Sequence, residues 1–117
     1  MVTLLDHVET YQALIEQADS AHAEGDLAQA VAKAWEAASY ALGTIAERRD
    51  WKFDTPADML TAMDRLSEET NRPDIDLLFE VAFIAPYNFE EGWIDAEGVE
   101  YDLQAVRKLL AMIEDIE

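Results

Sequence analysis

The sequence predicts an all-α protein, an up-and-down bundle of four to five helices forming a single domain over residues 1–117. Apolar residues recur at three- and four-residue spacing along most of the chain, and capping residues, prolines and glycines separate these stretches. No alternating strand pattern of useful length occurs. At 13.2 kDa, with 50% apolar and 29% charged residues, the chain has the composition of a globular protein with one core.

The first predicted helix covers residues 3–24. Thr3 is a suitable N-cap, and Gly25 follows the helix at the position where a left-handed residue commonly ends one. Its apolar stripe consists of Leu4, Val8, Tyr11, Ile15 and Ala18.

The second predicted helix starts after a cap at Asp26 and runs to about Arg49. It is rich in alanine and apolar over more than half its circumference, so we expect it to be the central helix, surrounded by neighbours. Gly43 costs about 1 kcal/mol relative to alanine inside a helix, which indicates a close neighbour there, either another helix or a second subunit. The candidate dimer face comprises Ala28, Ala32, Trp35, Ser39 and Gly43.

The remaining helices have clear start signals. Thr55, Pro56 and Asp58 begin a third helix that ends near Asn71, and Pro73 opens a fourth. Pro86 is expected to end or kink that fourth helix, leaving residues 87–98 as a structured connection. The last helix is predicted from the spacing of Val99, Leu103, Val106, Leu110 and Ile113.

The net charge of −18 excludes several functions. Only 8 basic residues oppose 26 acidic ones, so the surface repels phosphate backbones and nucleic-acid binding is disfavoured. Two explanations stay open, solubility in a cytoplasm of very high salt or an acidic interaction face. The chain has no cysteine, signal peptide or membrane-spanning stretch, which places it in the cytoplasm with no membrane association.

No sequence motif indicates a particular reaction, and we expect no catalytic residue, cofactor or metal. Asp19 and His22 have the spacing of a di-iron ligand pair, but a second such pair is missing. Polar residues along one side of the second helix, together with a few others near apolar segments, form the candidate ligand-binding set. That set is Gln29, Lys33, Glu36, Tyr40, Glu80, Asn88 and Glu91.

Two blocks of residues resemble the archaeal PaREP family of small helical proteins. The first contains Gly25-Asp26, Gln29-Ala30, Lys33, Trp35, Ala37-Ala38, Arg49 and Trp51, and the second runs from Ala82 through Asn88-Phe89-Glu90-Glu91 to Val99-Glu100. That family is similar to the HEPN superfamily of helical bundles, whose members dimerise and act as ribonucleases, as partners of nucleotidyltransferases in toxin-antitoxin pairs, or as nucleotide-binding modules. The resemblance implies a HEPN-like bundle and a homodimer.

The chain departs from the HEPN ribonucleases at their catalytic motif. Those enzymes carry Arg followed four to six residues later by His, whereas every Arg here follows both histidines. Pro86 also replaces a histidine that the PaREP family often has two residues before the Asn of its second block. Asn88, Phe89, Glu91 and Lys33 therefore carry over as structural or binding residues only.

The sequence thus favours a non-catalytic, homodimeric HEPN-like bundle that binds a protein partner, such as a nucleotidyltransferase, or a small nucleotide. One alternative is a ribonuclease or nucleotide-processing enzyme that uses Lys33, Tyr40, Glu80 or Asn88. Another is a structural subunit of a larger complex.

The first prediction concerns salt. At about 1 M salt the Debye length is about 3 Å, so repulsion among the exposed carboxylates is almost fully screened. We expect the melting temperature to rise steeply between dilute buffer and molar KCl, measured by circular dichroism. A melting temperature independent of KCl would contradict this explanation of the acidity.

Overall fold

The computed structural model describes residues 3–116, and this part of the chain contains five helices and no strand. The all-α prediction is therefore confirmed. The helices are α1 (Leu4–Ala23), α2 (Leu27–Arg48), α3 (Pro56–Thr70), α4 (Pro73–Glu90) and α5 (Ala96–Ile116).

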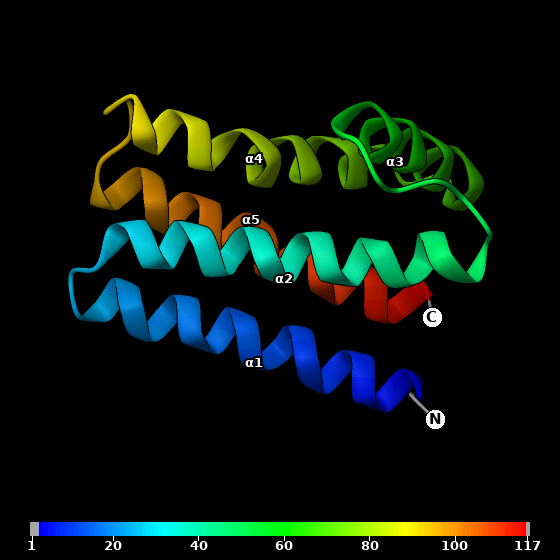
Figure 1. Cartoon of the computed structure of the whole chain (residues 1–117), viewed down its shortest axis with the longest axis horizontal. Helices are drawn as coiled ribbons and strands as arrows, with labels where there is room; N and C mark the ends of the chain where they lie inside the picture. Colours follow the sequence, from blue (N-terminus) through cyan, green and yellow to red (C-terminus); the bar gives the residue numbers. More distant parts are fainter. Residues whose placement is uncertain (1–2, 117) are drawn as a thin grey trace.

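Four of the helices run roughly along the long axis of the molecule (Figure 1). In that view α2 crosses the middle, with α1 on one side and α4 on the other, while α5 lies behind α2. α3 lies at one end, at an angle to the others, and packs mainly against α4. Three helices, α2, α4 and α5, each have extensive contacts with three others, so the central position that the sequence assigned to residues 26–49 alone is shared.

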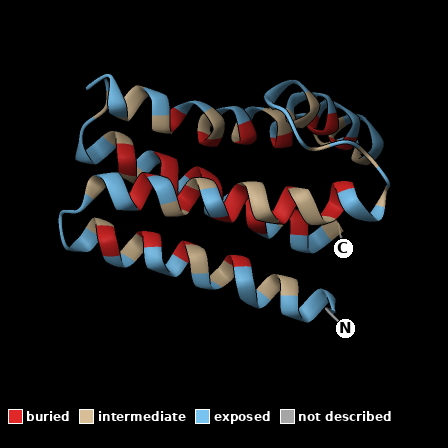
Figure 2. Ribbon diagram, viewed as in Figure 1, coloured by how far each residue is buried: buried red, intermediate tan, exposed pale blue. Residues whose placement is uncertain are grey.

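The most extensive helix contact joins α1 to α2, and small side chains make it possible. Ala30, Ala34, Ala37 and Ala41 of α2 are fully buried, as Figure 2 shows for this helix as a whole. Because alanine carries only a methyl group, the two backbones can approach closely along several turns. The buried residues of α2 form one broad arc, and α1, α4 and α5 pack against this helix.

The side chains of the candidate dimer face have varied surroundings. Ala28 and Ala32 are exposed, whereas Trp35 packs on Phe79 and Phe83 of α4, with ring centroids 5.7 and 5.6 Å apart. The Ser39 hydroxyl donates to the Trp35 carbonyl at 2.8 Å. The close neighbour expected at Gly43 is Phe53 of the same chain, whose ring carbons would lie 3.5 Å from a Cβ there.

The helix boundaries follow the capping signals. Thr3 and Thr55 each accept a backbone hydrogen bond three residues ahead, from Asp6 and Asp58, whose side chains bond back to the capping residues. α1 ends at Gly25, where φ is +82°, with the paired backbone bonds of a Schellman motif. Asp50, Asn71 and Gly92 have positive φ and end α2, α3 and α4 in the same way.

The expectation for Pro86 was wrong about the helix end. α4 continues through Pro86 to Glu90, and α5 begins at Ala96, so the connection between them is only residues 91–95. Proline removes one backbone hydrogen bond, but Phe89 beyond it packs against the core and favours a continued helix. The Schellman motif at Gly92, rather than the proline, ends α4.

Two glycines allow a paired test of the backbone argument. Gly92→Ala should lower the free energy of unfolding by about 1 kcal/mol, because alanine is strained at φ +76° although nothing lies within 4 Å of the new Cβ. Gly43→Ala should raise it by up to about 1 kcal/mol, because the residue is helical and Phe53 is at ordinary contact distance. Urea denaturation at fixed KCl measures both, and a destabilised Gly43→Ala would contradict the Phe53 packing.

A pocket between α4 and α5

A pocket of about 250 Å³ lies between α4 and α5. One face of α4 contributes Val81, Ile84, Ala85 and Asn88, whose three- and four-residue spacing aligns them along the groove. The opposite wall consists of Ile94, Gly98, Tyr101 and Asp102. Aliphatic and aromatic side chains predominate, so the carboxyl of Asp102 and the amide of Asn88 are the main polar groups available to a ligand.

Asp102 is the unusual residue of this pocket. It is 2% exposed, and its Oδ1 atom is buried without a hydrogen-bond partner. Burial raises the pKa of the Asp102 carboxyl to about 7, and no neighbouring charge contributes to that shift. Buried carboxyl groups normally accept hydrogen bonds or face a cation, because an unpaired charge is costly in an apolar environment.

The start of α5 shapes the wall near Asp102. The Asp95 side chain accepts a hydrogen bond from the Gly98 backbone at 3.1 Å, as an N-cap residue does. A Cβ on Gly98 would lie 2.7 Å from the Cβ of Ile94, so only glycine lets Ile94 fold back against this turn. Ile94 and Gly98 both line the pocket.

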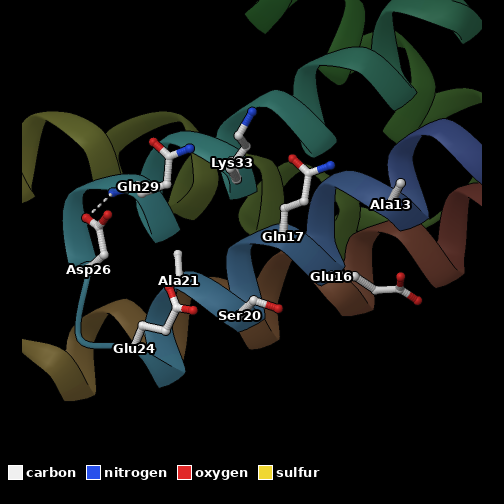
Figure 3. Close-up of a pocket in the computed structure, with 9 residues that line it drawn as sticks. All are labelled: Ala13, Glu16, Gln17, Ser20, Ala21, Glu24, Asp26, Gln29 and Lys33. Atoms are coloured by element: carbon white, nitrogen blue, oxygen red, sulfur yellow. Dashed lines mark hydrogen bonds between the residues drawn. The ribbon is translucent and has the colours of Figure 1, made fainter.

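Gln29 and Lys33 line a different depression, between α1 and α2 (Figure 3). This groove has a larger volume, about 480 Å³, but it is shallow and bordered by Glu16, Glu24 and Asp26. Carboxylates surround the single lysine, so the groove suits a phosphate-bearing ligand poorly. The larger of these two depressions is thus not the one with the more unusual chemistry.

The next two candidates on α2 contact other residues of the chain. Glu36 accepts a hydrogen bond from Lys33 Nζ at 3.2 Å, an exposed pair of the kind common on helix surfaces. The Tyr40 hydroxyl lies 2.7 Å from Nδ1 of His7 and joins α2 to the start of α1.

Glu80 and Glu91 are both exposed and lie on separate parts of the surface. Glu80 follows Asp76 by one helical turn on α4. The pKa of Asp76 is raised to about 6, first by partial burial, then by a hydrogen bond and repulsion from Asp64 of α3, and then by Glu80. These carboxylates repel one another, and every cause of the shift disfavours the charged form of Asp76. They are one place where added salt should relieve repulsion.

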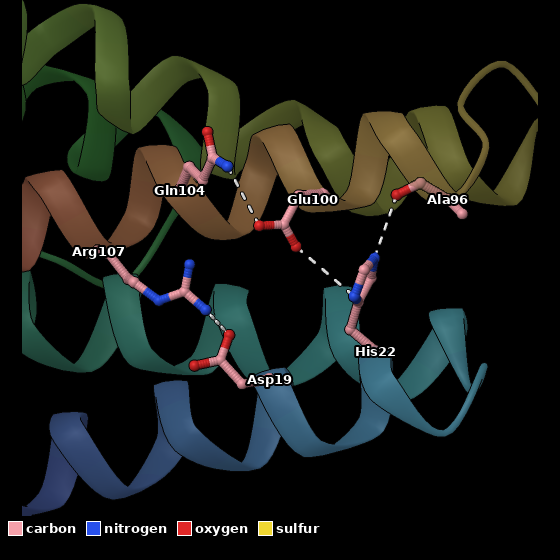
Figure 4. Close-up of polar contacts among 6 residues, drawn as sticks. All are labelled: Asp19, His22, Ala96, Glu100, Gln104 and Arg107. Atoms are coloured by element: carbon pink, nitrogen blue, oxygen red, sulfur yellow. Dashed lines mark hydrogen bonds and ion pairs between the residues drawn. The ribbon is translucent and has the colours of Figure 1, made fainter.

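Asp19 and His22 take part in a polar network between α1 and α5 (Figure 4). Asp19 forms an ion pair with Arg107. Nε2 of His22 lies 3.2 Å from the Ala96 carbonyl, and Nδ1 lies 3.5 Å from Glu100. Among residues 3–116, no group of three or more metal-ligating side chains is close enough to hold an ion.

Two arginines pack against the ring of Trp51, which follows the end of α2. The guanidinium groups of Arg49 and Arg65 lie 5.6 and 5.7 Å from the Trp51 ring, and Arg49 also pairs with Glu69 at 3.0 Å. These arginines therefore have structural contacts in the chain. Within the described chain, no helix is long and apolar enough to cross a membrane.

The structure thus distributes the seven candidate ligand residues over several surfaces. Of these, only Asn88 lines the pocket between α4 and α5. Sequence reasoning missed Asp102, although a signal was present. Asp102 follows Val99 by three residues and precedes Val106 by four, so a carboxylate occupies the apolar stripe of the last helix.

Replacing Asp102 tests the consequence of its burial. The raised pKa means that unfolding releases a proton between about pH 4 and pH 7, so the stability contribution of Asp102 falls as the pH rises through that window. Asp102→Asn should therefore match the wild type near pH 4 and be more stable above pH 7, by up to about 4 kcal/mol.

Chemical denaturation at a series of pH values measures the difference. Glu97→Gln, an exposed change on the same helix, should show no such pH-dependent gain. A constant difference between Asp102→Asn and the wild type across this range would mean that Asp102 titrates normally.

The fold and the sequence both resemble those of known proteins. The fold is similar to the crystal structure of a protein from Sulfolobus solfataricus, with a TM-score of 0.77 and 23% sequence identity over 93% of this chain and 94% of that one. No curated relative matches the chain. The sequence profile described as the Archaeal PaREP1/PaREP8 family matches residues 6–110, which include both blocks behind the predicted resemblance. The chain therefore belongs to the archaeal PaREP1/PaREP8 family.

Proposed function

We propose that this protein is a non-catalytic binding module that forms a homodimer through the outer surface of α4 and α5. The observation that carries the proposal is a cluster of apolar side chains at the surface, three of them exposed and two half-buried. We call this surface the α4–α5 face, and it consists of Leu77, Leu78, Val81, Ile84 and Tyr101.

A pair of helices that faces only water does not need the apolar side chains that the α4–α5 face carries. Leu77, Ile84 and Tyr101 are 64%, 44% and 65% exposed, and Leu77, Val81 and Ile84 follow one another at helical spacing. Clustered apolar side chains on a surface commonly mark an interaction site. The cluster supports association better than the α2 residues do, because Trp35 and Gly43 already contact side chains of the same chain.

Self-association is the form of assembly that the resemblance to HEPN-like proteins supports. Most homodimers have two-fold symmetry and use the same surface on both copies, so one apolar face per chain suffices. Each copy carries a charge of −18, which opposes association in dilute buffer. We therefore expect the dimer to form most readily in molar salt, in keeping with a high-salt cytoplasm.

The enzyme alternative is less well supported. Lys33 and Asn88 line different pockets, Tyr40 contacts His7, and Glu80 is exposed on α4. A general base and a stabilising cation must lie within reach of the same substrate, which this distribution does not favour. A nucleotide is also disfavoured because the Lys33 groove is bordered by carboxylates. A protein partner such as a nucleotidyltransferase remains compatible with an apolar face.

Light scattering in molar KCl tests the proposed dimer. The wild type should have twice the chain mass of 13.2 kDa, and Leu77→Glu should weaken association by about tenfold or more, because it buries a charge at the contact. Leu77 is exposed in the single chain, so this variant should still fold.

Two matched variants locate the contact. Leu5→Glu changes another exposed leucine, on α1, and should leave the dimer unchanged. Ala32→Glu introduces the same charge on the α2 face, and loss of the dimer in this variant alone would assign the contact to α2. A wild type that stays monomeric at every concentration would contradict self-association and favour a role as a subunit that needs a different partner.

A further inference from the structure

We propose that the pocket between α4 and α5 binds a small organic ammonium ion, with the ammonium group at Asp102 and the hydrocarbon part against the pocket wall. Val81, Ile84 and Tyr101 line this pocket and also belong to the α4–α5 face of the proposed dimer. The pocket argument depends on one buried side chain and on the residues around it.

The first argument is the unsatisfied acceptor. Oδ1 of Asp102 is buried and accepts no hydrogen bond, and the residue is 2% exposed at the wall of a pocket. An ammonium group is a donor with a compensating charge, so it would satisfy both requirements of a buried carboxylate. A phosphate or carboxylate ligand would instead place like charges together.

The second argument is the apolar character of the rest of the pocket. Val81, Ile84, Ala85 and Ile94 offer aliphatic contacts, and Tyr101 offers an aromatic ring. Such a wall favours the hydrocarbon part of a ligand and gives a strongly hydrated inorganic cation no replacement for its lost water. The α4 wall contributes one polar side chain, Asn88, whose amide oxygen can accept a second hydrogen bond from the ammonium.

The third argument is size. The pocket volume of about 250 Å³ corresponds to the space of about eight water molecules in the liquid. By this estimate, a primary amine with a chain of about four to six carbons fits that volume. The acidic surface raises the local concentration of any cation around the protein and so assists its entry.

A homologous series of alkylammonium chlorides tests the proposal. Ethyl-, butyl- and hexylammonium should bind the wild type saturably at pH 8, measured from amide shifts of Gly98 and Asp102 in ¹H–¹⁵N NMR spectra. Affinity should rise about fourfold for each methylene group until the pocket is full. Asp102→Asn should weaken butylammonium binding by about tenfold or more.

Three controls make the result specific. Glu97→Gln removes one exposed charge from the same helix and should change the affinity by less than about twofold, because exposed charges are screened. Butanol should bind more weakly than butylammonium, and KCl at the same concentration should give no saturable shift. The light-scattering mass of the same samples separates failed binding from failed self-association.

Other outcomes would overturn the proposal. Absence of saturable binding across the series would exclude an ammonium site, and equal affinity in Asp102→Asn would mean that the carboxyl does not contact the ligand. Equal binding of butanol would indicate an apolar pocket only, and a saturable response to KCl would indicate an inorganic cation site. Asp102→Asn is expected to be more stable than the wild type at pH 8, and its NMR spectrum checks directly that it is folded.

Discussion

The burial of α5 among α1, α2 and α4 is the constraint on which the rest of the structure depends. Two stripes of α5 are covered at once, one including Val99 and Leu103 and the other including Leu109. A helix enclosed in this way has little freedom to rotate, because turning it would expose apolar side chains on one side and crowd the core on the other. Asp102 lies within the enclosed region and is therefore buried with it.

The enclosure of Asp102 connects stability to the proposed binding site. A carboxyl group without a partner weakens the folded state once it ionises, and an apolar side chain there would avoid that cost. A group that reduces stability while lining a pocket is typical of a functional site. The same helix pair also exposes Leu77 and Tyr101, so the proposed ligand pocket and the proposed dimer contact both belong to α4 and α5.

Most of the fold could be predicted from local signals. The caps at Thr3 and Thr55, the left-handed residue Gly25 and the apolar spacing of α5 each depend on only a few neighbouring residues. The error at Pro86 has a tertiary cause, because the packing of Phe89 on distant residues favours a longer α4 than proline alone would predict.

The candidate site was harder to predict. Polar residues such as Lys33 and Tyr40 suggested a common ligand strip on α2, but pairing with Glu36 and His7 gives each a local role that spacing cannot reveal. Asn88 is a candidate from the sequence only because it lies near apolar segments, whereas its position in the pocket depends on how α5 packs against α4. Asp102 was visible as an acidic residue on an apolar stripe, yet only the fold distinguishes a buried carboxyl from one at the edge of the stripe.

The most direct test of this account is the titration of the Asp102 side-chain carboxyl by ¹³C NMR in the intact protein. The account predicts that its chemical shift changes with an apparent pKa near 7, well above those of exposed aspartates. A titration midpoint near 4 would show that the carboxyl is solvated or paired. The enclosure of α5 and the ligand site inferred from it would then both be wrong.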